Sequence, residues 1–94
     1  MIEVLIVEDD PMVSEINKNY LRDIPGYHVM GAVSSVQEAL QFLKTDLPDL
    51  ILLDIFMPEQ NGLALLTAIR QQQLDIDVIL ITAATDIESI HKAI

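Results

Sequence analysis

Polar side chains follow directly after three short apolar runs of the chain. They are Glu8, Asp9 and Asp10 after the first run, Asp54 after the third and Thr82 after the fourth. If these runs form neighbouring parallel strands, their carboxyl ends meet at one edge of a sheet, where open α/β sheets bind ligands. Two carboxylates about 4 Å apart repel by about 4 kcal/mol at an effective dielectric constant of about 20. A proton or a cation must therefore relieve the crowding.

A hard divalent cation suits this set of side chains. The ligands are oxygen atoms without a nearby His or Cys, which favours Mg²⁺, and Mg²⁺ also gathers phosphate oxygens. An aspartate beside such an ion and a threonine hydroxyl can accept a phosphoryl group by in-line attack. The alternative is structural, because strand-end acids are often solvated caps and threonine is common in strands. The spacing alone therefore leaves both interpretations open.

Four apolar runs alternate with helical patterns along the chain. The runs are residues 4–7 (VLIV), 29–33 (VMGAV), 50–53 (LILL) and 78–81 (VILI). Three of them lack polar alternation, which is typical of strands buried on both faces of a parallel sheet, whereas the second, with Gly31, suits an edge strand. The alternation predicts a parallel sheet with helices on both faces.

The helical segments carry their own signals. In the first, one face is shared by Val13, Ile16, Tyr20 and Ile24. Asp10 and Pro11 fit the N-cap and first helical position, and capping boxes are expected at 35–38 and 85–88. The last helical pattern ends at Ile94 without a following strand. We therefore expect a C-terminally incomplete domain, or a final strand edge that a partner protects.

Length and composition narrow the class of protein. The 94 residues fit one domain spanning 1–94, and the formal net charge of −10 argues against direct binding of nucleic acid or anionic membranes. Without cysteine, disulfide scaffolds and thiol catalysis are excluded. Neither a signal peptide nor an apolar stretch of about 18 residues is present. We expect a soluble, cytoplasmic domain.

Three motifs in order resemble the receiver domain of two-component response regulators. They are residues 5–11 (LIVEDDP), 48–62 around Asp54 and Met57-Pro58, and 79–83 (ILITA). The resemblance spans all 94 residues and implies a flavodoxin-like, doubly wound parallel α/β sheet in the order 2-1-3-4, with the fifth strand and helix absent. The sequence VEDDPMV, followed by INKNYL, is similar to the corresponding segment of regulators of citrate and C4-dicarboxylate metabolism. Those regulators carry a DNA-binding effector domain after the receiver.

The resemblance also implies roles for individual residues. Asp54 matches the phosphoacceptor, Asp9 a direct Mg²⁺ ligand and Glu8 a ligand through a metal-bound water. The backbone carbonyl of Phe56 matches a further ligand, Thr82 matches the switch hydroxyl, and Phe56 and Ala84 lie where the family tunes the site mouth. The family's lysine after the fifth strand is absent from this sequence, which puts signal transmission in doubt.

A sensor histidine kinase is the partner that the resemblance implies. A receiver catalyses its own phosphorylation and dephosphorylation but turns over no external substrate, so it is no ordinary enzyme. One alternative is a Mg²⁺-dependent phosphohydrolase that forms an aspartyl-phosphate. Such an enzyme normally has a second acidic residue two positions after the nucleophile, and the presence of Phe56 there argues against it. Another is a receiver-like module without phosphotransfer that dimerises through the fourth-strand edge or by strand swapping.

Overall fold

The computed structural model describes residues 1–54, 56–57 and 60–81. Its centre is a parallel sheet of four strands, β1 (Ile2–Val7), β2 (Tyr27–Val33), β3 (Leu50–Asp54) and β6 (Asp77–Ile81). The strands lie in the order β2-β1-β3-β6, which confirms the predicted order of the four apolar runs. β2 is an edge strand, as its composition indicates.

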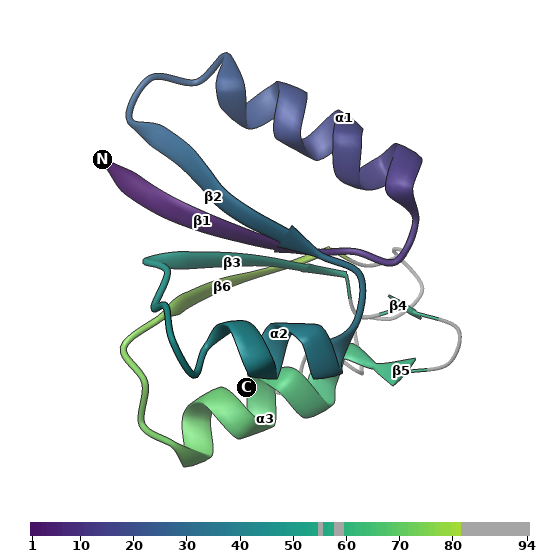
Figure 1. The fold of residues 1–94 in the computed structure, drawn as a ribbon, viewed down its shortest axis with the longest axis vertical. Helices are drawn as coiled ribbons and strands as arrows, with labels where there is room; N and C mark the ends of the chain where they lie inside the picture. The colour runs from purple at the N-terminus through teal and green to yellow at the C-terminus, as the bar shows by residue number, and fades with distance from the viewer. Residues whose placement is uncertain (55, 58–59, 82–94) are drawn as a thin grey trace.

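Helices cover both faces of this sheet (Figure 1). α1 (Pro11–Arg22) lies on one face, and α2 (Val36–Phe42) and α3 (Gly62–Gln71) lie on the other. A short antiparallel pair, β4 (Phe56–Met57) with β5 (Gln60–Asn61), follows β3 and was not predicted from the sequence. The predicted last helix and its capping box lie outside the described residues. No helix in the described part of the chain is both long and apolar enough to cross a bilayer.

The main core lies between the sheet and the α2–α3 face. Alternate strand residues enter it, because successive side chains of a strand point to opposite faces. They are Leu5 and Val7 of β1 with Ile51 and Leu53 of β3, all fully buried. Ala39 of α2 and Leu65 and Ile69 of α3 close the core from the helix side. This packing fixes β1 and β3 side by side, with their carboxyl ends together.

α1 begins as predicted but packs differently. Oδ1 of Asp10 accepts hydrogen bonds from the backbone N–H of Met12 at 2.9 Å and of Val13 at 3.4 Å, and Pro11 occupies the first turn. The apolar face expected from the sequence is not buried, since Tyr20 is 70% exposed and Ile16 is also exposed. Instead, the buried residue of the helix is Ser14.

Gly31 occupies a tight position in β2. The register between β1 and β2 shifts between Val4 and Leu5, immediately before the pairing of Leu5 with Gly31. A Cβ atom on Gly31 would lie 2.8 Å from a ring carbon of Phe42. Glycine therefore allows α2 to pack closely against the edge strand.

Candidate functional site

Three carboxylates converge at the carboxyl end of the sheet. Glu8 and Asp9 follow β1, and Asp54 is the last residue of β3. Val7 and Leu53 are paired in register, which sets the ends of the two strands beside each other. One carboxylate oxygen from each of Glu8, Asp9 and Asp54 lies within 4.8 Å of the other two. The structure thus contains the crowding of acids that the strand ends predicted.

Glu8 is the buried member of this cluster, with 5% of its surface exposed. Its backbone N–H donates to the carbonyl of Val33 at 3.0 Å, and its Oε2 accepts from the N–H of Asp10 at 3.2 Å. The pKa of Glu8 is raised to about 7, chiefly by burial; the hydrogen bond from the N–H of Asp10 lowers it, and the contacts with the carboxyls of Asp54 and Asp9 raise it. The cluster therefore favours a proton or a cation near neutral pH.

The donor set fits a hard divalent cation. All three candidate ligands offer carboxylate oxygens, which Mg²⁺ prefers to nitrogen or sulfur. Within residues 1–54, 56–57 and 60–81, neither Glu8 nor Asp9 forms an ion pair with a basic side chain. The positive charge that the cluster requires can therefore come from a bound ion.

A hollow of about 470 Å³ opens beside these acids, between α1 and the end of β2. Its lining includes Glu8, Asp9, Ser14, Ser34 and Glu38. The last three were not assigned to the site from the sequence. Helical spacing places Ser14 one turn after Asp10, and the Ser34-Ser35 pair directly follows β2, so both signals were present but unspecific.

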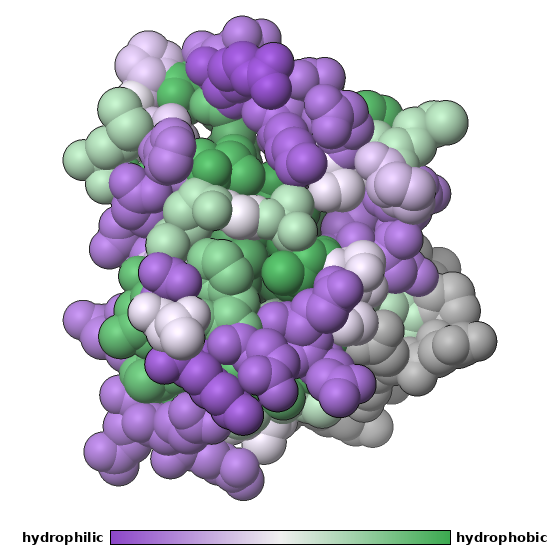
Figure 2. Space-filling model, in the orientation of Figure 1, coloured by the Kyte–Doolittle hydropathy of each residue, from purple (hydrophilic) through white to green (hydrophobic). Residues whose placement is uncertain are grey.

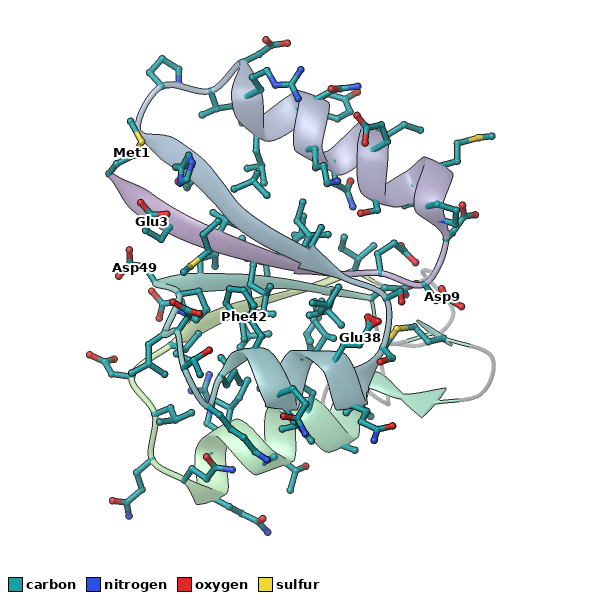
Figure 3. All side chains as sticks on the ribbon, in the orientation of Figure 1. Met1, Glu3, Asp9, Glu38, Phe42 and Asp49 are labelled. Atoms are coloured by element: carbon teal, nitrogen blue, oxygen red, sulfur yellow. The ribbon has the colours of Figure 1, made fainter. Side chains whose placement is uncertain are left out.

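Glu38 closes this hollow on the α2 side. Its backbone N–H donates to Oγ of Ser35 at 3.0 Å, as the predicted capping box requires. Its carboxylate, however, accepts from the N–H of Ser34 at 2.9 Å and from Oγ of Ser34 at 3.0 Å. These hydrogen bonds lower the pKa of Glu38. Glu38 and Asp9 lie at the same end of the molecule (Figure 3).

The remaining predicted site residues are only partly placed. The backbone of Phe56 belongs to β4, where Phe56 pairs with Asn61. The side chain of Phe56 lies outside the described residues, as do Thr82 and Ala84. The proposed roles of these three residues remain predictions.

Comparison with known proteins gives the family. The family model of the response regulator receiver domain matches residues 4–94. The transcriptional regulatory protein MalR of Bacillus subtilis is 54% identical over 94 residues, which cover 100% of this chain and 40% of MalR. The transcriptional regulatory protein DcuR of Escherichia coli K12 is 42% identical over 96 residues, with 100% of this chain and 40% of DcuR covered.

Solved structures agree with the fold. The MaeR response regulator bound to beryllium trifluoride is 40% identical with a TM-score of 0.81, covering 99% of this chain and 76% of that one. The MaeR D54A mutant bound to sulfate is 37% identical with a TM-score of 0.84, covering 98% of this chain and 75% of that one.

The chain belongs to the response regulator receiver domains of two-component systems, and its sheet has the flavodoxin-like arrangement of that family. Its relatives also include a protein named as the probable C4-dicarboxylate response regulator DctR, from Halalkalibacterium halodurans, which is 43% identical over 90 residues, with 96% of this chain and 39% of DctR covered. It spans about 40% of the length of the curated relatives MalR and DcuR.

Proposed function

We propose that Asp54 accepts a phosphoryl group from a phosphohistidine of a sensor histidine kinase, with Mg²⁺ bound at the carboxyl end of the sheet. The observation that carries this proposal is the convergence of Glu8, Asp9 and Asp54 within 4.8 Å. Asp9, Asp54 and the backbone carbonyl of Phe56 would hold the ion, and Glu8 would act through a bound water. When bound, Mg²⁺ supplies positive charge that neutralises phosphoryl oxygens.

Burial separates Glu8 chemically from Asp9 and Asp54, which are both partly exposed. Glu8 is buried and has a raised pKa, so it is poorly suited to attack an external donor. Asp54 is only half-buried at the end of β3. A carboxylate oxygen of Asp54 would attack phosphorus, the phosphorus–nitrogen bond of the donor would break, and the imidazole would leave and take up a proton from solvent. The product is an acyl phosphate on Asp54.

The relatives support this chemistry and suggest the output. Sulfate and beryllium trifluoride, which MaeR structures contain, resemble a phosphoryl group in shape and charge. MalR and DcuR are named as transcriptional regulators. We infer that phosphorylation shifts a two-state equilibrium involving Thr82 and controls a DNA-binding effector domain of a longer cytoplasmic protein. The chain would modify itself and turn over no external substrate.

Intact mass after incubation with acetyl phosphate and Mg²⁺ tests the proposal. We expect one phosphoryl adduct on the chain and none on Asp54→Asn. The matched control is Asp49→Asn, since Asp49 directly precedes β3 at the opposite end of the sheet and should leave the adduct unchanged. An adduct on Asp54→Asn would contradict the proposal, and sustained release of phosphate would instead favour the hydrolase.

A second candidate is a receiver-like module that dimerises without phosphotransfer. Among the described strands, β6 lies at the sheet edge opposite β2, and its Ile79 is 52% exposed. An exposed apolar edge strand favours pairing with another chain. A dimer in sedimentation experiments that loses its stability in Ile79→Lys, together with no phosphoryl adduct, would favour this function. A monomer at high concentration would exclude it.

A further inference from the structure

The outer edge of β2 offers unpaired backbone groups. Among the described strands, which lie in the order β2-β1-β3-β6, β2 has a neighbour on one side only. The carbonyl of Val33 accepts from Glu8 at 3.0 Å, so the backbone groups of Val33 face β1. Because backbone groups alternate in direction along a strand, the N–H and carbonyl of Ala32 face away from the sheet. Ala32 is itself exposed, so its small side chain leaves these groups accessible.

Hollows flank this edge on both faces of the sheet. The hollow on the α1 side has a volume of about 440 Å³ and is lined by Lys18, Arg22, His28, Val29, Gly31 and Ala32. The hollow on the α2 side has a volume of about 540 Å³ and includes Ala32, Gln37, Glu38 and Gln41. Figure 2 shows an apolar band across the side of the molecule that it displays, with hydrophilic surfaces of the helices above and below the band.

The hollow on the α1 side concentrates positive charge on an acidic protein. The chain has 5 Lys and Arg residues against 15 Asp and Glu residues, yet Lys18 and Arg22 line this one hollow. Lys18 lies 3.7 Å from Glu15, a distance typical of a weak surface pair. Arg22 forms no ion pair within the described part of the chain. Both cations can therefore bind an external carboxylate.

We propose that the free edge of β2 binds an extended, acidic peptide segment of a partner protein. The segment adds as a strand beside Ala32, and its backbone bonds to the outward N–H and carbonyl. Its side chains alternate between the two faces. Acidic side chains on one face enter the hollow with Lys18 and Arg22, and neutral side chains on the other face meet Gln37 and Gln41.

Charge complementarity selects this occupant over a second copy of the chain. The β2 segment of a second copy, YHVMGAV, contains neither Asp nor Glu. Pairing of two β2 edges would therefore leave the Lys18 and Arg22 side chains of each copy without a carboxylate from the added strand. An acidic strand supplies both the backbone bonds and the negative charge.

Fluorescence anisotropy on the intact protein tests this interaction with short labelled peptides. The probe alternates glutamate and valine, one control peptide has lysine in place of glutamate, and another has the same composition with its glutamates in one block. We expect the alternating acidic peptide to bind more tightly than both controls. Equal binding of the blocked peptide would overturn strand addition, because it would show that charge alone suffices.

Variants of the protein locate the peptide. The double variant Lys18→Glu with Arg22→Glu should weaken binding by about tenfold or more, because each attraction becomes a repulsion. Lys44→Glu makes the same kind of charge change between α2 and α3 and should leave affinity unchanged. Equal losses in both proteins, or no loss in the double variant, would overturn the proposal.

The backbone contribution has its own test. Ala32→Pro removes an N–H that faces away from β1, and proline is tolerated at such edge positions. We expect weaker peptide binding with an unchanged far-UV circular dichroism spectrum. In the unmodified protein, peptide should also slow hydrogen exchange at the Ala32 amide, a measurement that requires no variant. An unprotected Ala32 amide at saturating peptide would overturn the proposal.

Discussion

The two ends of the sheet use the same acidic residue types in different ways (Figure 3). At the amino end, Oε2 of Glu3 contacts Nδ1 of His28 at 2.7 Å, and Oδ2 of Asp49 accepts from the N–H of Glu3 at 2.9 Å. At the carboxyl end, Glu8 contacts the carboxyls of Asp54 and Asp9, and within the described residues neither Glu8 nor Asp9 pairs with a basic side chain. The protein thus supplies polar partners for the carboxylates of Glu3 and Asp49 at the amino end. At the carboxyl end, three carboxyl groups lie close together instead.

This difference shows that the number of acids at a strand end does not define a site. Parallel strands leave free N–H groups at their amino ends, and such donors stabilise carboxylates there, as the N–H of Glu3 does for Asp49. At the carboxyl ends, strands leave carbonyls, which cannot donate. Carboxylates that meet there need an external cation or a proton, and this requirement provides the chemistry of the site.

The largest expected effect is a pH-dependent stability that only the carboxyl end produces. In the folded chain without divalent ions, the pKa of Glu8 is raised from 4.5 to about 7. A raised carboxyl pKa contributes stability that is complete below about pH 4.5 and lost as the pH rises through about 7, at most about 3 kcal/mol. Urea unfolding in EDTA should show this loss, and Glu8→Gln should remove most of it.

Glu3→Gln is the matched control for that experiment, because Glu3 is the acid of the amino end. Its pH dependence should follow that of the unmodified chain between pH 5 and 8. An equal pH dependence in Glu8→Gln and the unmodified chain would contradict the assignment of the titration to the carboxyl end. Added Mg²⁺ should restore more stability at pH 8 than at pH 5, since deprotonated Glu8 favours the ion.

The next effect concerns affinity for the ion. Asp9→Asn removes one of the three converging carboxylates and should weaken Mg²⁺ binding by about tenfold to a hundredfold. Asp49→Asn should change it by less than about twofold, because Asp49 lies at the other end of β3. Isothermal titration calorimetry measures both variants. Similar losses in the two proteins would mean that net charge, not the cluster, attracts the ion.

A smaller effect separates Asp10 from its acidic neighbours. Oδ1 of Asp10 caps α1, so Asp10→Ala should lower the free energy of unfolding by about 1 kcal/mol. Asp10→Asn keeps a capping oxygen and should retain most of that stability. Neither variant should alter Mg²⁺ affinity beyond its effect on folding. A tenfold loss of Mg²⁺ affinity in Asp10→Asn would mean that Asp10 belongs to the cluster of Mg²⁺ ligands and does not only cap α1.

The smallest effect belongs to the amino end. The His28–Glu3 pair is solvent-exposed on both sides, so His28→Ala should cost less than about 0.5 kcal/mol of stability. Phosphorylation of Asp54 should proceed unchanged. Denaturant unfolding and intact mass measure the two quantities. A loss of the phosphoryl adduct in this variant would show that the two ends of the sheet are coupled.

The sequence by itself determined much of this architecture. The apolar runs predicted the four parallel strands, the resemblance to receiver domains implied their order, and Asp10 with Pro11 predicted the start of α1. The position of Asp54 after the third run also predicted its approach to the acids after the first. These features depend on local residue chemistry or on the way parallel strands end, and both leave a direct trace in the order of residues.

Only the tertiary structure decided which side chains are buried and which close on one another. Tyr20 belongs to an apolar stripe yet is exposed, whereas Ser14 is polar and buried, because burial depends on which side of α1 faces the sheet. Likewise, the carboxylate of Glu38 accepts a hydrogen bond from Ser34, whereas Ser35 caps the helix. Glu8 acquires its raised pKa because residues far apart in the chain exclude water from it. Burial depends on all the segments that pack around a group, and no short stretch of sequence contains that information.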